Sequence, residues 1–263
     1  MFGESLRNVF RGMQPLLKKF RADLHIHSCL SPCSDWDMSP KNIVAKSLEQ
    51  RLDLIAICDH NTAENAAVTL REGARQGITV LPGLEVCSKE EVHLVTLFKK
   101  IDDTLKMQEY VYAHLPGENK PEVFGHQVVA DEHDHVLGEN ARLLIGATQL
   151  SLLEIVEKVH HLEGICISSH VDRPSYSLIG QLGFIPEDLY LDAVEVSYRV
   201  PLDRALTEIA GINDYPCVTS SDAHFLHDIG KVWTEFVLAA PSLEEIRMAF
   251  EGIDGRRILN TAE

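Results

Sequence analysis

The chain has no apolar run that approaches the roughly 20 residues needed to cross a membrane, so we expect no membrane partner. Its first residues also lack the apolar stretch of a secretory signal peptide, which predicts a cytoplasmic protein. We find no internal repeat and no low-complexity tract. The length of 263 residues suits one α/β barrel or two modest domains, and we predict one domain over residues 1–263.

Basic residues are scarce. The sequence has 24 lysines and arginines against 40 acidic residues, a formal net charge of -16. Because non-specific binding to nucleic acid needs a basic surface, and no stripe of aromatic and basic residues is present, we expect no long nucleic acid as a partner. A small phosphorylated substrate stays compatible, since bound divalent ions can reverse the local field. Residues 1–20 are mostly basic among their charged residues and predict an N-terminal helix packed on the body.

The six cysteines do not form a disulfide framework. Cys29 and Cys33 share a loop, but this spacing without a second cysteine pair is a weak zinc signal. The other four lie in or beside apolar strand-like runs, where a free thiol behaves as a small hydrophobic group. They are Cys58, Cys87, Cys166 and Cys217. In a cytoplasmic protein we therefore expect free thiols.

Apolar strand patterns alternate with helical patterns along the chain. We predict strands at 22–26, 53–58, 78–86, 91–98, 164–169, 192–196, 216–220 and 233–238. Helix starts are indicated by Ser39-Pro40 and by capping boxes at 151–154 and 242–245, and a further helix is predicted at 102–114. This alternation favours a parallel α/β sheet or barrel.

Residues 115–147 break the alternation. Their proline, glycine and asparagine content, with Val123-Phe124 and Val128-Val129 on either side of Gly125, predicts an inserted hairpin or lid. Covering the site and contacting another copy of the chain are both open roles for this insertion.

Two histidines separated by one residue end the first predicted strand. Side chains alternate along a strand, so His25 and His27 point the same way and are able to hold one metal ion. Other strand ends also carry histidine or an acid: Asp59, His60, Glu85, His93, His170, Asp222 and His224. The carboxyl ends of barrel strands meet at one rim, so we expect these residues to converge. Burying so many ionisable groups would be costly without a metal or a pairing partner.

These segments resemble the PHP (polymerase and histidinol phosphatase) superfamily, in particular its stand-alone phosphoesterases. They follow the family's order over roughly 21–235 and are Asp23-Leu24-His25-Ile26-His27-Ser28, Cys58-Asp59-His60-Asn61-Thr62, Pro82-Gly83-Leu84-Glu85, Val92-His93-Leu94, Ser169-His170 and Ser221-Asp222-Ala223-His224. The resemblance implies a distorted seven-stranded (β/α) barrel. It also implies three divalent ions, with zinc, manganese and iron as the candidates.

The resemblance further implies how the ligands divide. The first ion takes His25, His27, Glu85 and Asp222; the second takes Glu85, His93 and His170; the third takes His60, His224 and an acid of the loop after the first motif. Relatives place Ser-Asp-Gly in that loop, whereas this loop is longer and lacks glycine. We select Asp35, from its distance to Pro40, with Asp37 as the alternative. Asp59 is expected to orient a ligand.

Three carboxylates against three divalent cations leave a net positive site, which suits phosphate. We therefore expect a hydroxide bridging two ions to hydrolyse a phosphate ester of a small molecule or nucleotide. Arg173 is the first candidate for a phosphate clamp and Arg199 the second, with Glu195 as a buried partner for one of them. The alternatives are a phosphodiesterase or exonuclease on short oligonucleotides and a non-catalytic metal-binding regulatory module. The oligomeric state stays open.

Overall fold

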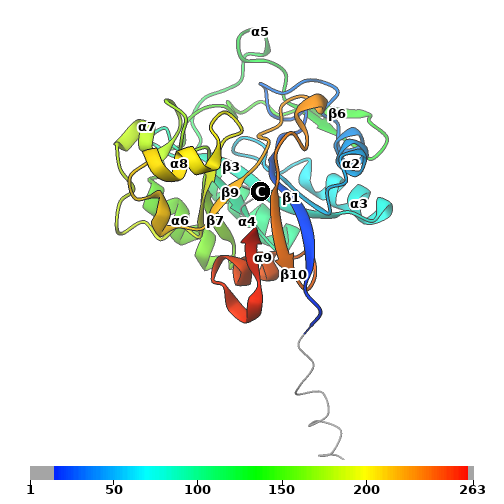
Figure 1. Cartoon of the computed structure of the whole chain (residues 1–263). Helices are drawn as coiled ribbons and strands as arrows, with labels where there is room; N and C mark the ends of the chain where they lie inside the picture. The colour runs from blue at the N-terminus through cyan, green and yellow to red at the C-terminus, as the bar shows by residue number, and fades with distance from the viewer. Residues whose placement is uncertain (1–14, 260–263) are drawn as a thin grey trace, which may run out of the picture.

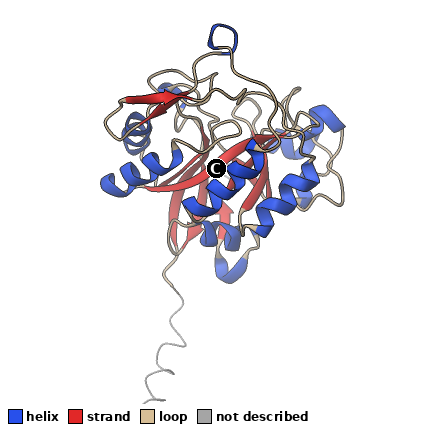
Figure 2. Cartoon of the chain, turned by 180° about the vertical axis from the view of Figure 1, so that it is seen from behind, coloured by secondary structure: helices blue, strands red, loops and turns tan. Residues whose placement is uncertain are grey.

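A nine-stranded mixed sheet curls into a nearly closed barrel with helices around its outside (Figures 1 and 2). The computed structural model describes residues 15–259. In sheet order the strands are β11 (Arg257–Leu259), β10 (Thr234–Leu238), β1 (Lys18–Ile26), β2 (Leu54–Ile57), β3 (Thr79–Cys87), β4 (His93–Leu97), β7 (Ile165–Ser168), β8 (Ala193–Val196) and β9 (Cys217–Thr219). The predicted α/β barrel is confirmed, but its count of seven strands was too low. The antiparallel strands β10 and β11 extend the sheet beyond β1.

The helices follow the strands in the predicted alternation. They are α2 (Pro40–Glu49), α3 (Ala66–Gln76), α4 (Ile101–Tyr112), α5 (Pro121–Phe124), α6 (Leu152–His161), α7 (Leu178–Leu182), α8 (Leu202–Glu208) and α9 (Leu243–Phe250), with 3₁₀ turns η1 (Ile212–Asp214), η2 (Leu226–Asp228) and η3 (Ile253–Gly255). The capping box of Ser151 and Glu154 is present. At α9 only half of the predicted box forms, because the Glu245 carboxylate accepts from the Ala239 backbone and pairs with Arg256. None of the described helices is long and apolar enough to span a membrane.

The start of β1 corrects the predicted N-terminal helix. Residues 18–20 are extended, because β1 pairs antiparallel with β10 from Lys18 opposite Leu238 to Ala22 opposite Thr234. The backbone groups that a helix would use are therefore engaged in the sheet. Residues 1–14 of the predicted helix lie outside the described residues.

The predicted insertion forms a hairpin of β5 (Val128–Ala130) and β6 (Val136–Glu139). Val123-Phe124 do not join it, since Pro121 begins the single-turn helix α5 and Gly125 ends it at a φ of 101°. In Figure 1, α5 and β6 lie at the end of the molecule toward which β1 runs. Asn65 holds β5 there by accepting from the backbone of Ala130 and donating to the carbonyl of Val128.

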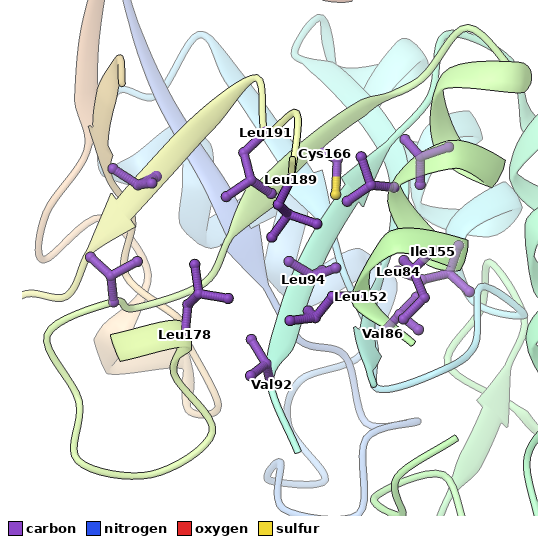
Figure 3. Close-up of a cluster of buried hydrophobic side chains, with 14 of the residues drawn as sticks. Leu84, Val86, Val92, Leu94, Leu152, Ile155, Cys166, Leu178, Leu189 and Leu191 are labelled. Atoms are coloured by element: carbon purple, nitrogen blue, oxygen red, sulfur yellow. The ribbon is translucent and has the colours of Figure 1, made fainter. Parts of the chain in front are cut away.

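Several apolar cores hold the barrel and its helices together, and two of them position the site. The first lies outside the sheet, where Leu84 and Leu94 of β3 and β4 pack with Leu152 and Ile155 of α6 (Figure 3). The second draws residues from every strand of the sheet and from α9, so it fills the barrel interior. In Figure 1, α9 lies at the end opposite α5, so the apolar interior leaves the α5 end for polar residues.

Candidate metal centre

The inward-facing series of each strand changes from apolar to polar at the α5 end of the barrel. Leu54 and Ala56 of β2 and Cys58 just after it belong to the interior core, and His60 continues their alternation. Leu81 of β3 leads by the same alternation to Glu85. The following sets have the same pattern: Val95 with His93, Ala193 with Glu195, and Val218 with Asp222. Strand β4 runs antiparallel to its neighbours, and its ligand therefore stands at its first residue.

Strand β1 reaches the same rim through an irregularity. Ala22 and Leu24 lie in the interior core, so unbroken alternation would turn His25 and His27 outward. The register of β1 against β2 shifts between Asp23 and Ile26, as in a β-bulge. Beyond the shift, Ile26 packs in a core outside the barrel and the two histidines face inward.

Glu85 lies at the centre of five histidine side chains. Its Oε1 atom is 3.3 Å from Nε2 of His25, 3.1 Å from Nδ1 of His93 and 3.3 Å from Nε2 of His170. Its Oε2 atom is 3.4 Å from Nε2 of His27 and 3.0 Å from Nδ1 of His60. The Glu85 side chain is 1% exposed. Its carboxylate directs one oxygen to each set of histidine rings and is enclosed by their nitrogen atoms.

Asp222 closes the other side of the histidine pair. Its Oδ1 atom is 3.1 Å from Nε2 of His27 and 3.4 Å from Nε2 of His25, and the two Nε2 atoms are 3.1 Å apart. Asp222 has a φ of 48° and His170 a φ of 29°, unusual for residues other than glycine. Such backbone strain at strand ends is typical of functional sites.

Three overlapping groups of residues place their ligand atoms within 4.8 Å of one another. They are His25, His27, Glu85 and Asp222; His60, Glu85 and His93; and His27, His60 and His224. The first group has the same members as the ligand set expected for the first ion. The second brings in His60 in place of His170, although Nε2 of His170 also faces Glu85.

Within residues 15–259, the carboxylate of the loop acid expected for the third ion does not join the histidine groups, although the backbone N–H of Asp35 donates to the carbonyl of His224 at 2.9 Å. Among the described residues, neither Asp35 nor Asp37 belongs to any of the three groups. A carboxylate oxygen of Asp35 instead accepts from the backbone N–H of Asp37. This turn is local to the loop. The third group contains His27 in the place where an acid was expected.

Buried hydrogen bonds orient the histidine pair. Both carboxylate oxygens of Glu195 lie 3.2 Å from Nδ1 of His25. Glu195 is thus the partner of a histidine, and the predicted arginine pairing was wrong because its carboxylate points to the barrel axis. The Ser31 hydroxyl is 2.9 Å from Nδ1 of His27 and donates to Asp59, which also accepts from Ser28. Asp59 therefore orients the His27 ring indirectly, through the Ser31 hydroxyl.

Charge at the site keeps its carboxylates ionised. Burial acts to raise the pKa of Glu85, but His93 and His25 outweigh it and hold that pKa well below the ordinary value. Burial acts in the same way on Asp222, and His25 and His27 again lower its pKa well below the ordinary value. Both side chains therefore present negative oxygens to the centre.

The donor set fits divalent metal ions. Among the described residues, three buried atoms that face this centre lack a hydrogen-bond partner: Oε1 of Glu85, Oδ1 of Asp222 and Nδ1 of His93. Unpaired buried polar atoms are costly, and a cation would satisfy all three. Imidazole nitrogens with carboxylate oxygens suit zinc, manganese and iron.

A cavity of about 280 Å³ opens over the cluster. Arg173 lines it, with a guanidinium nitrogen 2.6 Å from Oδ2 of Asp222. Arg199 also lines it, and so does Ile145 from the end of the insertion. Asn61 holds that end by donating to the carbonyls on either side of Ile145, both at 2.8 Å. Residues 115–147 thus supply part of the cavity wall.

Comparison with known families finds two matches along this chain. Residues 23–195 match the family described as PHP domain, and residues 204–251 match the one described as PHP-associated. The Bacillus subtilis protein "Uncharacterized protein YqxK" is 23% identical over 275 residues, covering 92% of this chain and 65% of that protein. The Escherichia coli "5'-3' exoribonuclease Rnm" is 32% identical over 80 residues, which is 28% of this chain and 26% of that one.

Solved structures share the fold. The lesion-specific endonuclease PfuEndoQ from Pyrococcus furiosus has a TM-score of 0.68 at 20% identity, covering 92% of this chain and 58% of that one. Endonuclease Q in complex with a 27-mer duplex substrate has a TM-score of 0.70 at 20% identity, covering 91% and 58%. This chain thus spans about two thirds or less of the length of these relatives and structures.

The Endonuclease Q complex corrects the exclusion of long nucleic acid. A protein of this fold holds a 27-mer duplex with an abasic lesion at its active site. The exclusion was wrong because net charge is a sum over the whole chain, whereas binding depends on the field at the binding surface. In that sum the acidic residues of the whole chain outnumber the basic ones, so the positive charge of a site residue such as Arg173 is hidden.

Proposed function

This chain belongs to the PHP domain family of metal-dependent phosphoesterases, and from that premise we propose that it hydrolyses phosphodiester bonds of nucleic acid. The observation that carries the proposal is the enclosure of Glu85 by histidines from several strands, with Asp222 and Arg173 at the rim. The fold shared with Endonuclease Q and the partial similarity to an exoribonuclease favour a diester of nucleic acid as substrate.

The metal ligands in this proposal are the residues of the three groups together with His170. When bound, divalent ions there lower the pKa of water and neutralise charge on the phosphate. Glu85 contributes to two groups, and His27 and His60 also contribute to two each. Such sharing would allow one carboxylate to serve two ions, and we propose three ions in all. We keep Asp35 as the proposed acid for the third ion, because its backbone N–H donates to the carbonyl of His224.

Arg173 is the proposed clamp for the scissile phosphate. Its guanidinium lies over Asp222 on the wall of the cavity, and its Nε atom is buried without a partner among the described residues. A guanidinium presents two parallel donors to two phosphate oxygens. A phosphate bound in the cavity near Glu85 and Asp222 would therefore lie within reach of the Arg173 guanidinium on the cavity wall. Arg199 lines the same cavity farther along the chain and is the second proposed clamp.

Metal-reconstituted protein tests this function on three substrates: a labelled oligonucleotide, bis(p-nitrophenyl) phosphate and a mononucleotide. We expect cleavage of both diesters, its loss in excess chelator and its return with Mn(II) or Zn(II). His25→Ala should abolish turnover and leave the protein folded. His161→Ala, on the exposed side of α6, is the matched control and should retain activity.

Four outcomes would contradict the proposal. Full activity in chelator with metal loss confirmed would remove the metal mechanism, and wild-type turnover of His25→Ala would remove the ligand assignment. Hydrolysis of the mononucleotide alone would replace the diesterase with a phosphomonoesterase. Tight metal binding without turnover of any of the three substrates would support the regulatory module.

A further inference from the structure

A second cavity, of about 410 Å³, shares a wall with the metal cavity. It lies between the loop that enters α8, the start of β10 and the end of β11, and Figure 1 shows α8 and β10 on either side of β9. Arg199 lines both cavities. The volume of this second cavity is within the range of about 300–1,000 Å³ typical of small-ligand pockets. We refer to it as the side pocket.

Aromatic rings and cations occur together in the side pocket. Tyr198 is 45% exposed, so part of its ring is accessible to a ligand. The Arg199 guanidinium lies 5.9 Å and the Lys231 ammonium 5.8 Å from the centre of that ring. Trp233 adds a second, half-buried ring to the lining. Stacking rings beside cations are what proteins use to bind single-stranded nucleic acid.

The charge of Arg199 is available to a ligand. Within residues 15–259, its guanidinium forms no ion pair with a carboxylate, whereas Arg173 pairs with Asp222 and Lys231 with Asp228. In a chain of net charge -16, an unpaired guanidinium between two cavities favours an anionic occupant. A phosphate at Arg199 would have the metal cluster on one side and the side pocket on the other.

We propose that the side pocket binds the nucleotide next to the scissile phosphodiester. The base of this nucleotide would lie against Tyr198 and Trp233, and its phosphate would lie at Arg199. This inference rests on the proposed function and narrows its substrate to chains of at least two nucleotides. Val200 and Leu202 form apolar walls that suit a base better than water. Lys231 then faces the next phosphate along the strand.

Trp233 allows the pocket to be tested by binding alone. The chain has two tryptophans, Trp36 and Trp233, so Trp36→Phe leaves Trp233 as the single fluorescent indole. We expect a short oligonucleotide with phosphorothioate linkages to quench this fluorescence saturably. Adding Tyr198→Ala should weaken that binding about tenfold, within the range for loss of one base stack. Adding Tyr190→Ala, an exposed tyrosine outside both cavities, should leave it unchanged.

Turnover separates this inference from the proposed function. Tyr198→Ala should raise the KM for a short oligonucleotide about tenfold relative to Tyr190→Ala. Cleavage of oligonucleotide without quenching of Trp233, and with the KM of Tyr198→Ala unchanged, would overturn the inference and leave the diesterase intact. Saturable quenching without cleavage of any diester would overturn the diesterase and support the pocket. Quenching that depends on protein concentration alone would assign the pocket to a second copy and overturn the inference.

Discussion

Glu195 is predicted to set metal affinity through His25. Its carboxylate lies 3.2 Å from Nδ1 of His25, while Nε2 of the same ring faces Glu85 and Asp222. A carboxylate at Nδ1 keeps the proton on that nitrogen and leaves the lone pair of Nε2 for a cation. Replacing Glu195 by Gln keeps the volume of the side chain and removes its charge.

The expected size of the effect follows from these contacts. Loss of a residue that orients a metal-bound histidine typically costs about 10–100-fold in metal affinity, or about 1.4–2.8 kcal/mol. We expect Glu195→Gln near the lower limit, since its amide oxygen still accepts from His25. Glu195→Ala should lie near the upper limit. It also removes the acceptor for the backbone N–H of His170, so two buried donors lose their partner, at about 1–3 kcal/mol each.

Competition with a chromophoric chelator measures the metal affinity, and urea unfolding of the metal-free protein measures stability. Glu157→Gln, on the exposed face of α6, makes the same change of charge away from the site and should leave both unchanged. A metal affinity of Glu195→Gln within twofold of the wild type would refute the orienting role. If metal binding is weaker in Glu195→Ala but not in Glu195→Gln, Glu195 contributes packing and does not orient His25 through its charge.

Three further results are expected. Asp23→Ala removes the acceptor of two buried backbone N–H groups, Ser221 at 3.0 Å and Gly230 at 3.2 Å, and should lower the free energy of unfolding by about 2–6 kcal/mol in urea. A much smaller loss would mean that these contacts do not close the barrel. Hydrogen bonds from Arg75 lower the pKa of Glu72 from 4.5 to about 2, so their contribution is present above pH 4.5 and disappears as the pH falls through 2. Because Arg75 is exposed, Glu72→Gln should cost only about 1 kcal/mol at neutral pH and nothing near pH 2, and an equal cost at both would contradict the ion pair. Chelation should lower the Tm, and Mn(II) or Zn(II) should restore it, because ions that bind only the folded chain stabilise it; a constant Tm with metal loss confirmed would contradict the site.

The periodicity of the sequence predicted most of the barrel. Apolar runs flanked by helix-start signals identified β1 to β4 and β7 to β10 to within a few residues, because buried strands need continuous apolar sequence. The exposed hairpin strand β6 carried no such run and was not predicted. Residues 257–259 were missed, since a three-residue strand carries little pattern and is recognised by its partner β10. Residues 18–20 were read as helix for the same reason: their pairing with β10 lies more than 200 residues away.

The site residues were predictable where a ligand lies within a strand or a few residues beyond its end. His60, Glu85 and Asp222 share the alternation of their strands' inward residues, so strand position alone indicated their direction. The loop acid was not predictable in this way. A loop has no fixed periodicity, and the turn of Asp35 depends on a local bond to the backbone of Asp37. Glu195 was noted as buried, yet its partner was set by which strands lie next to each other.

The sequence by itself determined that His25 and His27 share one face of a strand, because alternation is a local property of extended backbone. It did not determine which face. Ala22 and Leu24 occupy the barrel interior, and only the shift of register against β2 turns the histidines inward above them. That shift depends on pairing with a neighbouring strand, so tertiary structure alone decided that the two histidines point to Glu85 and Asp222.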